Sequence, residues 1–92
     1  KMILENLLNN YKSIAQNNLM ITDHSHIVWM CDEVLKNLNT IHDDKVHKLF
    51  KINRWLGFIQ GWLYSCKLKT IDVLRNETRG IDDELFEILD RG

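Results

Sequence analysis

Histidine and cysteine are the side chains in this sequence whose chemistry could hold a metal ion. The chain contains four histidines and two cysteines, and imidazole and thiolate are the usual ligands of zinc. His24 and His26 are two residues apart at the start of a predicted helix, so their side chains point roughly 200° apart around its axis. Cys31 is not placed to complete a set with them, and His42 and His47 lie farther along the chain. We therefore predict surface histidines and no metal site.

Nucleophilic catalysis needs a serine or cysteine beside a histidine and a third group that orients the histidine. Neither Cys31 nor Cys66 has a neighbouring histidine in a recognisable pattern, and no serine lies in a nucleophile-elbow motif. The paired carboxylates of Asp82 and Asp83 lie where a helix is predicted to begin, and capping of that helix already explains them. We therefore predict a protein that is not an enzyme, has no catalytic residues and needs no cofactor.

A set of polar side chains is embedded in the apolar sequence that follows residue 53. A buried arginine, glutamine or tyrosine hydroxyl needs hydrogen-bond partners, so these groups either lock helices together or meet a ligand. If a ligand binds, paired arginines with aromatic neighbours suit a planar anion such as a nucleotide. For the internal lock we expect Arg75 or Arg79 to bond back to the segment 43–65 or to a nearby carboxylate. The candidate ligand-binding residues are Arg54, Gln60, Tyr64, Arg75 and Arg79.

Charge is unevenly distributed along a chain whose net charge is -1. Residues 42–69 contain six lysines and arginines against two acids, whereas residues 70–92 contain seven acids against three arginines. The two regions either neutralise one another, within a chain or between chains, or the basic region meets an anionic partner. The basic set is modest for direct binding to nucleic acid. It consists of Lys45, Lys48, Lys51, Arg54, Lys67 and Lys69.

The elements that carry these residues are predicted to be helices. The sequence has 92 residues, of which 45% are hydrophobic and 27% charged, and it contains no proline. Its glycines lie at positions 57, 61, 80 and 92, so few residues could form the turns of hairpins. A chain of this length buries only roughly 60–65% of its unfolded surface, so assembly with another chain is an alternative source of stability. We predict one all-α domain over residues 1–92.

Hydrophobic periodicity places about five helices along the chain. They are expected at residues 2–17, from Thr22 or Asp23 to about residue 41, at 43–65, from Thr70 to Thr78, and from Asp82 onward. Residues 55–64 are apolar nearly all round, so the helix 43–65 is expected to be the buried centre of the fold. The residues that we expect to be mostly buried there are Trp55, Leu56, Phe58, Ile59 and Leu63. Thr70 and Asp82 are predicted N-caps, and Gly80 is predicted to end the fourth helix in the left-handed conformation.

Gly57 and Gly61 are four residues apart within the predicted third helix and therefore share one of its faces. Each costs about 1 kcal/mol relative to alanine inside a helix, so a compensating role is expected. The structural interpretation is that the backbone of a neighbouring helix approaches closely across this face. The functional interpretation is a gap that admits a ligand, lined by Gln60 and Tyr64. Of the two, we expect the structural interpretation, in which a neighbouring helix packs closely against Gly57 and Gly61.

No stretch of the sequence approaches the roughly 20 apolar residues that a membrane-spanning helix needs. The N-terminal residues also lack the apolar region of a signal peptide. Cys31 and Cys66 are far from any CxxC spacing and are interpreted as buried, reduced thiols. We therefore expect a cytoplasmic protein that does not interact with membranes.

Residues 53–79 contain two neighbouring motifs, which read NRWLGFIQG at 53–61 and TIDVLRNETR at 70–79. They resemble a class of small helical proteins of tailed phages and prophages that share the pattern NRWLGFxQG…TIDxLRxxTR. Phage accessory proteins of this size commonly bind a host enzyme or defence component, or sequester a defence signal, so the resemblance implies a phage origin and such a role. Arg54-Trp55-Leu56 and Gln60-Gly61 are also loosely similar to helical-hairpin phage proteins that sequester cyclic nucleotides.

Two functional hypotheses follow from these residues. The first is a non-enzymatic phage accessory protein that binds and inhibits a host protein, for host takeover or anti-defence, alone or as a homo-oligomer. The sequence contains three tryptophans, and aromatic anchors dominate protein interfaces, so Trp29 is the candidate contact residue. The alternative is a helical protein that sequesters a nucleotide signal or binds nucleic acid through the arginine set.

Overall fold

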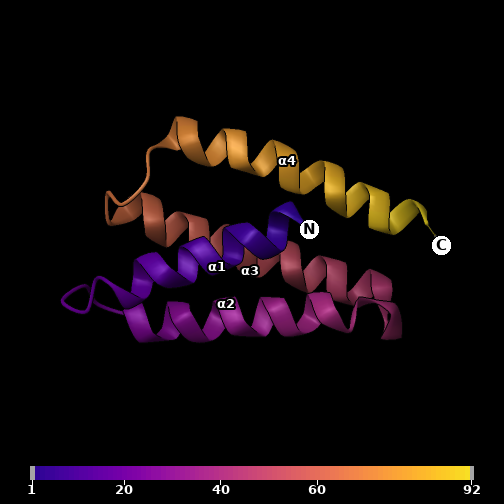
Figure 1. Cartoon of the computed structure of the whole chain (residues 1–92), viewed down its shortest axis with the longest axis horizontal. Coiled ribbons are helices and arrows are strands. Elements are labelled where there is room, and N and C mark those ends of the chain that lie inside the picture. Colours follow the sequence, from indigo (N-terminus) through magenta and orange to yellow (C-terminus); the bar gives the residue numbers. More distant parts are fainter. Residues whose placement is uncertain (1, 92) are drawn as a thin grey trace.

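The helices are arranged so that each runs antiparallel to the one before it along the chain (Figure 1). The computed structural model describes residues 2–91, and within them lie four α-helices and one short 3-10 helix. Their bounds are α1 (Ile3–Gln16), α2 (His24–Asn39), η1 (Ile41–Asp43), α3 (Lys45–Ser65) and α4 (Ile71–Asp90). The all-α prediction is confirmed, and no strand occurs in the described part of the chain.

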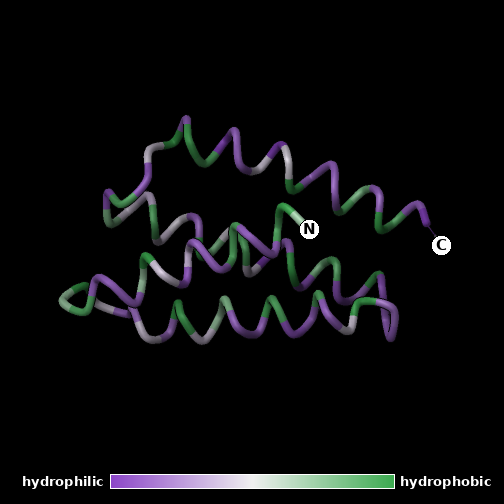
Figure 2. The backbone as a smooth tube through the Cα atoms, viewed as in Figure 1, coloured by the Kyte–Doolittle hydropathy of each residue, from purple (hydrophilic) through white to green (hydrophobic). Residues whose placement is uncertain are grey.

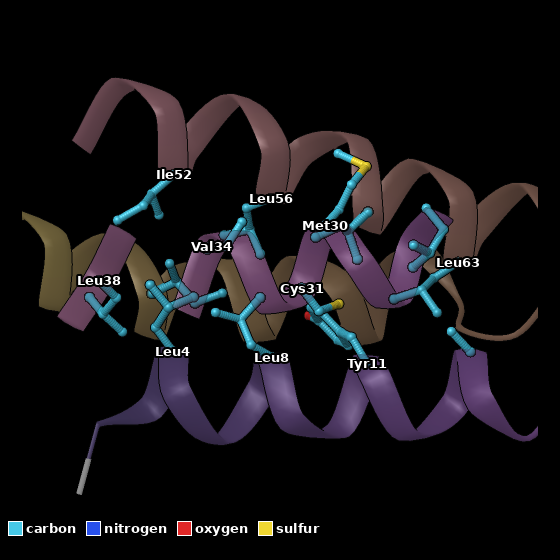
Figure 3. Close-up of a cluster of buried hydrophobic side chains, with 14 of the residues drawn as sticks. Leu4, Leu8, Tyr11, Met30, Cys31, Val34, Leu38, Ile52, Leu56 and Leu63 are labelled. Carbon is cyan, nitrogen blue, oxygen red and sulfur yellow. The ribbon is translucent and has the colours of Figure 1, made fainter. Parts of the chain in front are cut away.

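The core lies between the four helices, because each contributes one apolar stripe at helical spacing. α1 packs against α2, α2 against α3, and α4 against both α1 and α3. Figure 2 shows the alternation of apolar and polar turns along the backbone, and Figure 3 shows side chains from α1, α2 and α3 meeting. The fully buried side chains include Leu4, Leu8, Tyr11, Ala15, Ile27, Cys31, Val34, Ile52, Ile59, Leu63 and Ile81.

α4 also caps α1. The carboxylate of Glu84 accepts hydrogen bonds from the backbone N–H of Ile3 and of Leu4, the latter at 2.8 Å. The first backbone N–H groups of a helix have no partner within the helix, so a carboxylate from elsewhere in the chain satisfies them and favours the helix dipole. This contact fixes the start of α1 against the second half of α4.

The prediction of five helices is wrong, because Ile71–Asp90 form one helix and not two. Gly80 lies inside α4, so it does not end a helix there, and Asp82 is not an N-cap. A Cβ at Gly80 would lie 3.5 Å from the side chain of Ile3, which is ordinary contact. Continuing the helix buries Leu74 and Ile81 on one face, and this burial outweighs the low helix propensity of one glycine. The predicted N-cap at Thr70 is confirmed, since its side chain accepts from Val73 N.

α3 is not the central, fully buried helix that its composition predicted. It packs against α2 and α4, and its buried residues are confined to one stripe. That stripe comprises Ile52, Leu56, Ile59 and Leu63. Phe58 was expected to be buried and is 58% exposed, and Tyr64 is 54% exposed. With four helices side by side, each turns only one face to the core, and the remaining apolar residues of α3 are partly buried beside it or exposed.

The longest helices of the described chain carry too many charged and polar residues to cross a membrane.

Candidate binding surfaces

A polar network joins α1, α3 and α4 at the edge of the core. Gln60 Nε2 donates to the hydroxyl of Tyr11 and to Thr78 Oγ1, both at 3.2 Å. The Tyr11 hydroxyl donates to Glu77 Oε1 at 2.7 Å, and Lys69 Nζ donates to the other oxygen of Glu77 at 2.8 Å. Gln60 therefore acts as the internal lock that the sequence allowed, and its amide is already occupied.

Tyr11 is the member of this network that sequence reasoning did not single out. Its side chain is fully buried, and this burial raises the pKa of the phenol well above its usual value. The hydrogen bond to Glu77 adds to the rise, and the hydrogen bond from Gln60 opposes it. Lys69 Nζ also lies 5.4 Å from the centre of the Tyr11 ring, so the cation contacts the ring face. Within residues 2–91 no buried side-chain nitrogen or oxygen lacks a partner, so the network is complete without a ligand. A tyrosine within the apolar stripe of α1 was the available signal.

The prediction that Arg75 or Arg79 bonds back to α3 or to a carboxylate is wrong. Both arginines are exposed, and Arg79 reaches only Asn76 Oδ1 at 3.4 Å on its own helix. Among the described residues neither arginine forms an ion pair. They lie instead along an open cleft of about 460 Å³ between α3 and α4. We call it the arginine cleft, and its lining residues are Gln60, Gly61, Tyr64, Ile71, Leu74, Arg75, Thr78 and Arg79.

The close packing predicted at Gly57 and Gly61 is also wrong. A Cβ placed on either glycine would have no neighbouring heavy atom within 4 Å. Both positions are exposed on α3, and Gly61 lines the arginine cleft. The neighbouring helices pack against the buried stripe of α3, and the glycine face points away from that stripe. The missing side chains therefore leave open space, which fits the alternative of a gap beside Gln60 and Tyr64.

Trp29 does not lie in the arginine cleft but on the opposite side of α3, where α2 and α3 meet. Its ring is stacked on His26, with centroids 5.5 Å apart, and lies 5.7 Å from the ring of Trp55. Lys51 Nζ lies 5.4 Å from the centre of the Trp55 ring. Trp29 is 50% exposed. We call this the tryptophan surface, and it comprises His26, Trp29, Lys51 and Trp55.

The basic residues predicted for nucleic acid do not form one stripe. Lys48 Nζ donates to the carbonyl of Thr40 at 2.7 Å, and Lys45 Nζ donates to the carbonyl of Leu89 at 3.2 Å. Lys69 is paired with Glu77 as described above. Arg54 is exposed on α3 and lines none of the clefts described here. Half of the set is therefore engaged within the chain, which weakens it as a surface for phosphates.

A third surface, which sequence reasoning missed, is an apolar groove of about 360 Å³ between the first half of α3 and the second half of α4. Its residues are Val46, Leu49, Phe50, Asn53, Asp82, Leu85, Phe86 and Leu89. Phe50 is 71% exposed and Phe86 is 64% exposed. The signal was present in the apolar residues of two helices, but their meeting depends on α4 being continuous past Gly80.

The cysteines are both free, as expected, but only Cys31 is buried, and Cys66 is partly accessible. Burial first, and then the nearby charge of Asp32, raise the pKa of the Cys31 thiol to about 12, although Lys12 opposes the shift. The protonated thiol of Cys31 is a poor metal ligand and a poor nucleophile. Residues 2–91 contain no cluster of three or more histidine, cysteine or acidic side chains that could hold a metal ion.

Comparison with known proteins finds no matching family model, no matching curated protein and no matching solved structure.

Proposed function

We propose that the protein is a non-enzymatic phage accessory protein that binds and inhibits a host protein in the cytoplasm of the host cell. The observation that carries this proposal is the tryptophan surface, where Trp29 is half exposed beside the ring of Trp55. Clustered exposed apolar side chains mark protein contact sites, and tryptophan is enriched in binding hot spots. The phage resemblance of residues 53–79 supplies the biological context.

The tryptophan surface is ordered before any partner arrives. His26, one helical turn before Trp29, stacks on its indole, and Trp55 approaches it from α3. Side chains that are already held in one rotamer lose little entropy on binding, so such a surface gains affinity from its rigidity. Lys51 lies over Trp55, and Arg54 is exposed one turn away on α3. We therefore expect a partner segment that combines apolar or aromatic residues with carboxylates.

The experiment is a pull-down from host lysate at physiological salt, followed by titration calorimetry with the purified partner and an assay of that partner's activity. Trp29→Ala should weaken retention strongly, because a truncated hot-spot residue costs about 2 kcal/mol or more. The matched control is Tyr64→Ala, which removes another exposed aromatic ring from the other side of α3. Retention of the same host protein by the Trp29 variant, or no retained protein with the parent, would contradict the proposal.

A second candidate function is the sequestering of a nucleotide, and the arginine cleft favours it. Arg75 and Arg79 are one helical turn apart on α4, Tyr64 lies across from them on α3, and Gly61 leaves the space between them open. Guanidinium groups bind phosphates through paired hydrogen bonds, and an aromatic ring offers a stacking surface to a base. Gln60 borders the cleft but is engaged with Tyr11, so it would contribute shape rather than a free amide.

The test of the second candidate is a thermal-shift panel of mono-, di- and cyclic nucleotides. A ligand at 100 times its dissociation constant adds about 2.7 kcal/mol of stability, which is readily measured. Arg75→Ala with Arg79→Ala should abolish the shift, whereas Arg54→Ala, outside the cleft, should leave it unchanged. Absence of any shift across the panel would exclude the nucleotide. Binding to nucleic acid would instead weaken steeply as salt concentration rises.

A further inference from the structure

The arginine cleft and the apolar groove lie end to end along the seam between α3 and α4. The two helices are antiparallel (Figure 1), so the start of α3 lies beside the end of α4. The residues that line the two clefts run along α4 through 71–89 with no step longer than three positions, and along α3 through 46–64 with one interruption at 54–59. Such spacing keeps them on one face of each helix. The combined channel, which we call the α3–α4 trough, is about 27 Å long at 1.5 Å per residue.

Gly57 joins the two clefts, because it lies in the middle of the interruption on the same face of α3. It is four positions after Asn53, in the apolar groove, and four before Gly61, in the arginine cleft. A Cβ on Gly57 or Gly61 would meet no heavy atom within 4 Å, so packing within the chain does not require either glycine. Glycine is unfavourable inside a helix and is used where another group approaches the backbone closely. The two glycines leave that approach open along the trough.

Two hydrogen bonds across the seam hold the walls of the trough in place. Gln60 donates to Thr78 at 3.2 Å within the arginine cleft, and Lys45 Nζ donates to the carbonyl of Leu89 at 3.2 Å at the far end. A groove whose walls are already fixed loses little freedom when a ligand binds.

The spacing of the lining residues in the apolar groove fits a third helix. On α3 the groove is lined by positions 46, 49, 50 and 53, and on α4 by positions 82, 85, 86 and 89. Both sets follow the spacing i, i+3, i+4 and i+7, by which one helix packs on another. Phe50 and Phe86, one from each wall, are the most exposed of these side chains. The two helices thus present the paired apolar stripes between which a further helix packs in a bundle.

The charges of the trough differ along its length. Arg75 and Arg79 line the part next to the turn between α3 and α4, and within residues 2–91 neither forms an ion pair. Asp82, one turn after Arg79, is the charged residue that lines the apolar groove. Guanidinium groups bind carboxylates through paired hydrogen bonds. A complementary molecule therefore carries carboxylates at one end, a basic residue near its middle and apolar side chains throughout.

We propose that the α3–α4 trough binds an amphipathic α-helix of another protein, with a continuous apolar stripe and carboxylates at one end. A helix that fills the trough has about 18 residues. Its apolar side chains pack between the two exposed phenylalanines and over the two glycines, which is the helix-in-groove mode of recognition. The trough and Trp29 lie on different sides of α3, so this contact does not rest on the function proposed for the tryptophan surface. A nucleotide in the arginine cleft would compete with the helix for the same arginines.

The first experiment selects binders of the full chain from a displayed library of constrained helical peptides of about 18 residues, randomised along one stripe and at both ends. We expect enriched peptides to have apolar residues at the helical spacing and acidic residues at one end. Synthetic copies should bind the parent in fluorescence anisotropy, and Phe50→Glu should weaken them at least about tenfold, because the new carboxylate would be buried without a partner. No enriched peptide, or equal binding to the Phe50 variant, would overturn the proposal.

Phe58→Glu is the matched control for that variant, because Phe58 is 58% exposed on the same helix and lines neither cleft. It should leave peptide binding unchanged, and circular dichroism checks that both variants are folded. Arg75→Glu with Arg79→Glu should weaken the acidic-ended peptides at least about tenfold and favour copies whose acidic end is exchanged for lysines. Acidic-ended peptides that bind this double variant as tightly as the parent would refute the assigned chemistry.

Gly57→Leu separates an open trough from a structural glycine. Its side chain meets no neighbour in the free protein, so the melting temperature should stay the same or rise. The same side chain obstructs the trough, so peptide binding should weaken at least about tenfold. Undiminished binding would show that the peptides lie elsewhere.

Sedimentation velocity of the parent from low to high micromolar concentration tests the other occupant of the trough. We expect a monomer, which leaves the trough free for a partner helix. A dimer that Phe50→Glu dissociates and Phe58→Glu does not would place a second copy of the chain there and overturn the proposal.

Discussion

Replacing Tyr11 by phenylalanine should destabilise the fold well beyond the effect of losing one oxygen atom at the surface. The hydroxyl donates to the carboxylate of Glu77 at 2.7 Å and accepts from Gln60 at 3.2 Å. A hydrogen bond to a charged group contributes about 1.5–3 kcal/mol, and a neutral bond contributes about 0.5–1.5 kcal/mol. After the substitution Gln60 still donates to Thr78, and Glu77 still accepts from Lys69. These bonds partly offset the stability lost with the hydroxyl. We expect Tyr11→Phe to cost about 2–3 kcal/mol.

That cost is large for this protein, because a chain of 92 residues has a free energy of unfolding of only about 5–14 kcal/mol. The melting temperature should fall by about 8–24 °C, measured by circular dichroism at a fixed protein concentration. Tyr64→Phe is the control, since Tyr64 is 54% exposed and should change the melting temperature little. A double-mutant cycle with Glu77→Gln isolates the bond between the two side chains. Equal melting temperatures for the Tyr11 and Tyr64 variants would refute the network as a lock.

Two further predictions follow from burial and from open space. Gly57→Ala and Gly61→Ala should each raise the free energy of unfolding by about 0.5–1 kcal/mol in denaturant titrations, because a Cβ at either position meets no neighbour. A loss of stability at either glycine would restore the close-packing interpretation. The free energy of unfolding should also decrease as pH rises above about 9, because in the unfolded chain the thiol of Cys31 and the phenol of Tyr11 ionise, whereas in the folded protein both stay protonated. The decrease should reach up to about 1.4 kcal/mol per pH unit for each group. Thiol titration of the native protein should then detect Cys66 before Cys31, and equal rates would contradict the burial of Cys31.

Hydrophobic periodicity predicted α1 and α2 well, because every residue of an apolar stripe satisfies the same local rule. Leu4, Leu8 and Tyr11 follow this helical spacing in the sequence, and all three are fully buried. The same reasoning failed at Gly80, where two local signals, a glycine and an aspartate two residues later, suggested a helix end. Helix propensity is a weak preference of about 1 kcal/mol for one glycine, and the burial of Ile81 against the core exceeds it.

The candidate sites were harder to predict because they depend on which helices become neighbours. Gln60 required a partner, and the sequence indicated this need, but Tyr11 lies 49 residues away along the chain. Arg75 and Arg79 are exposed because their side of α4 faces solvent. The periodicity of a single helix specifies an apolar face, but it does not specify which other helix or which solvent-exposed groove that face adjoins.

The composition of α3 has its explanation in these surfaces. A helix that is apolar nearly all round would be buried in a larger protein, yet α3 has only one face in the core, formed by residues such as Ile52 and Ile59. Among its other apolar residues, Trp55 lies beside Trp29 of α2, whereas Val46 and Phe50 line the groove between α3 and α4. The two groups lie on different sides of one helix, so binding at one of them need not block the other. Substitutions at Trp29 and at Phe50 should therefore act independently, because distant sites behave additively.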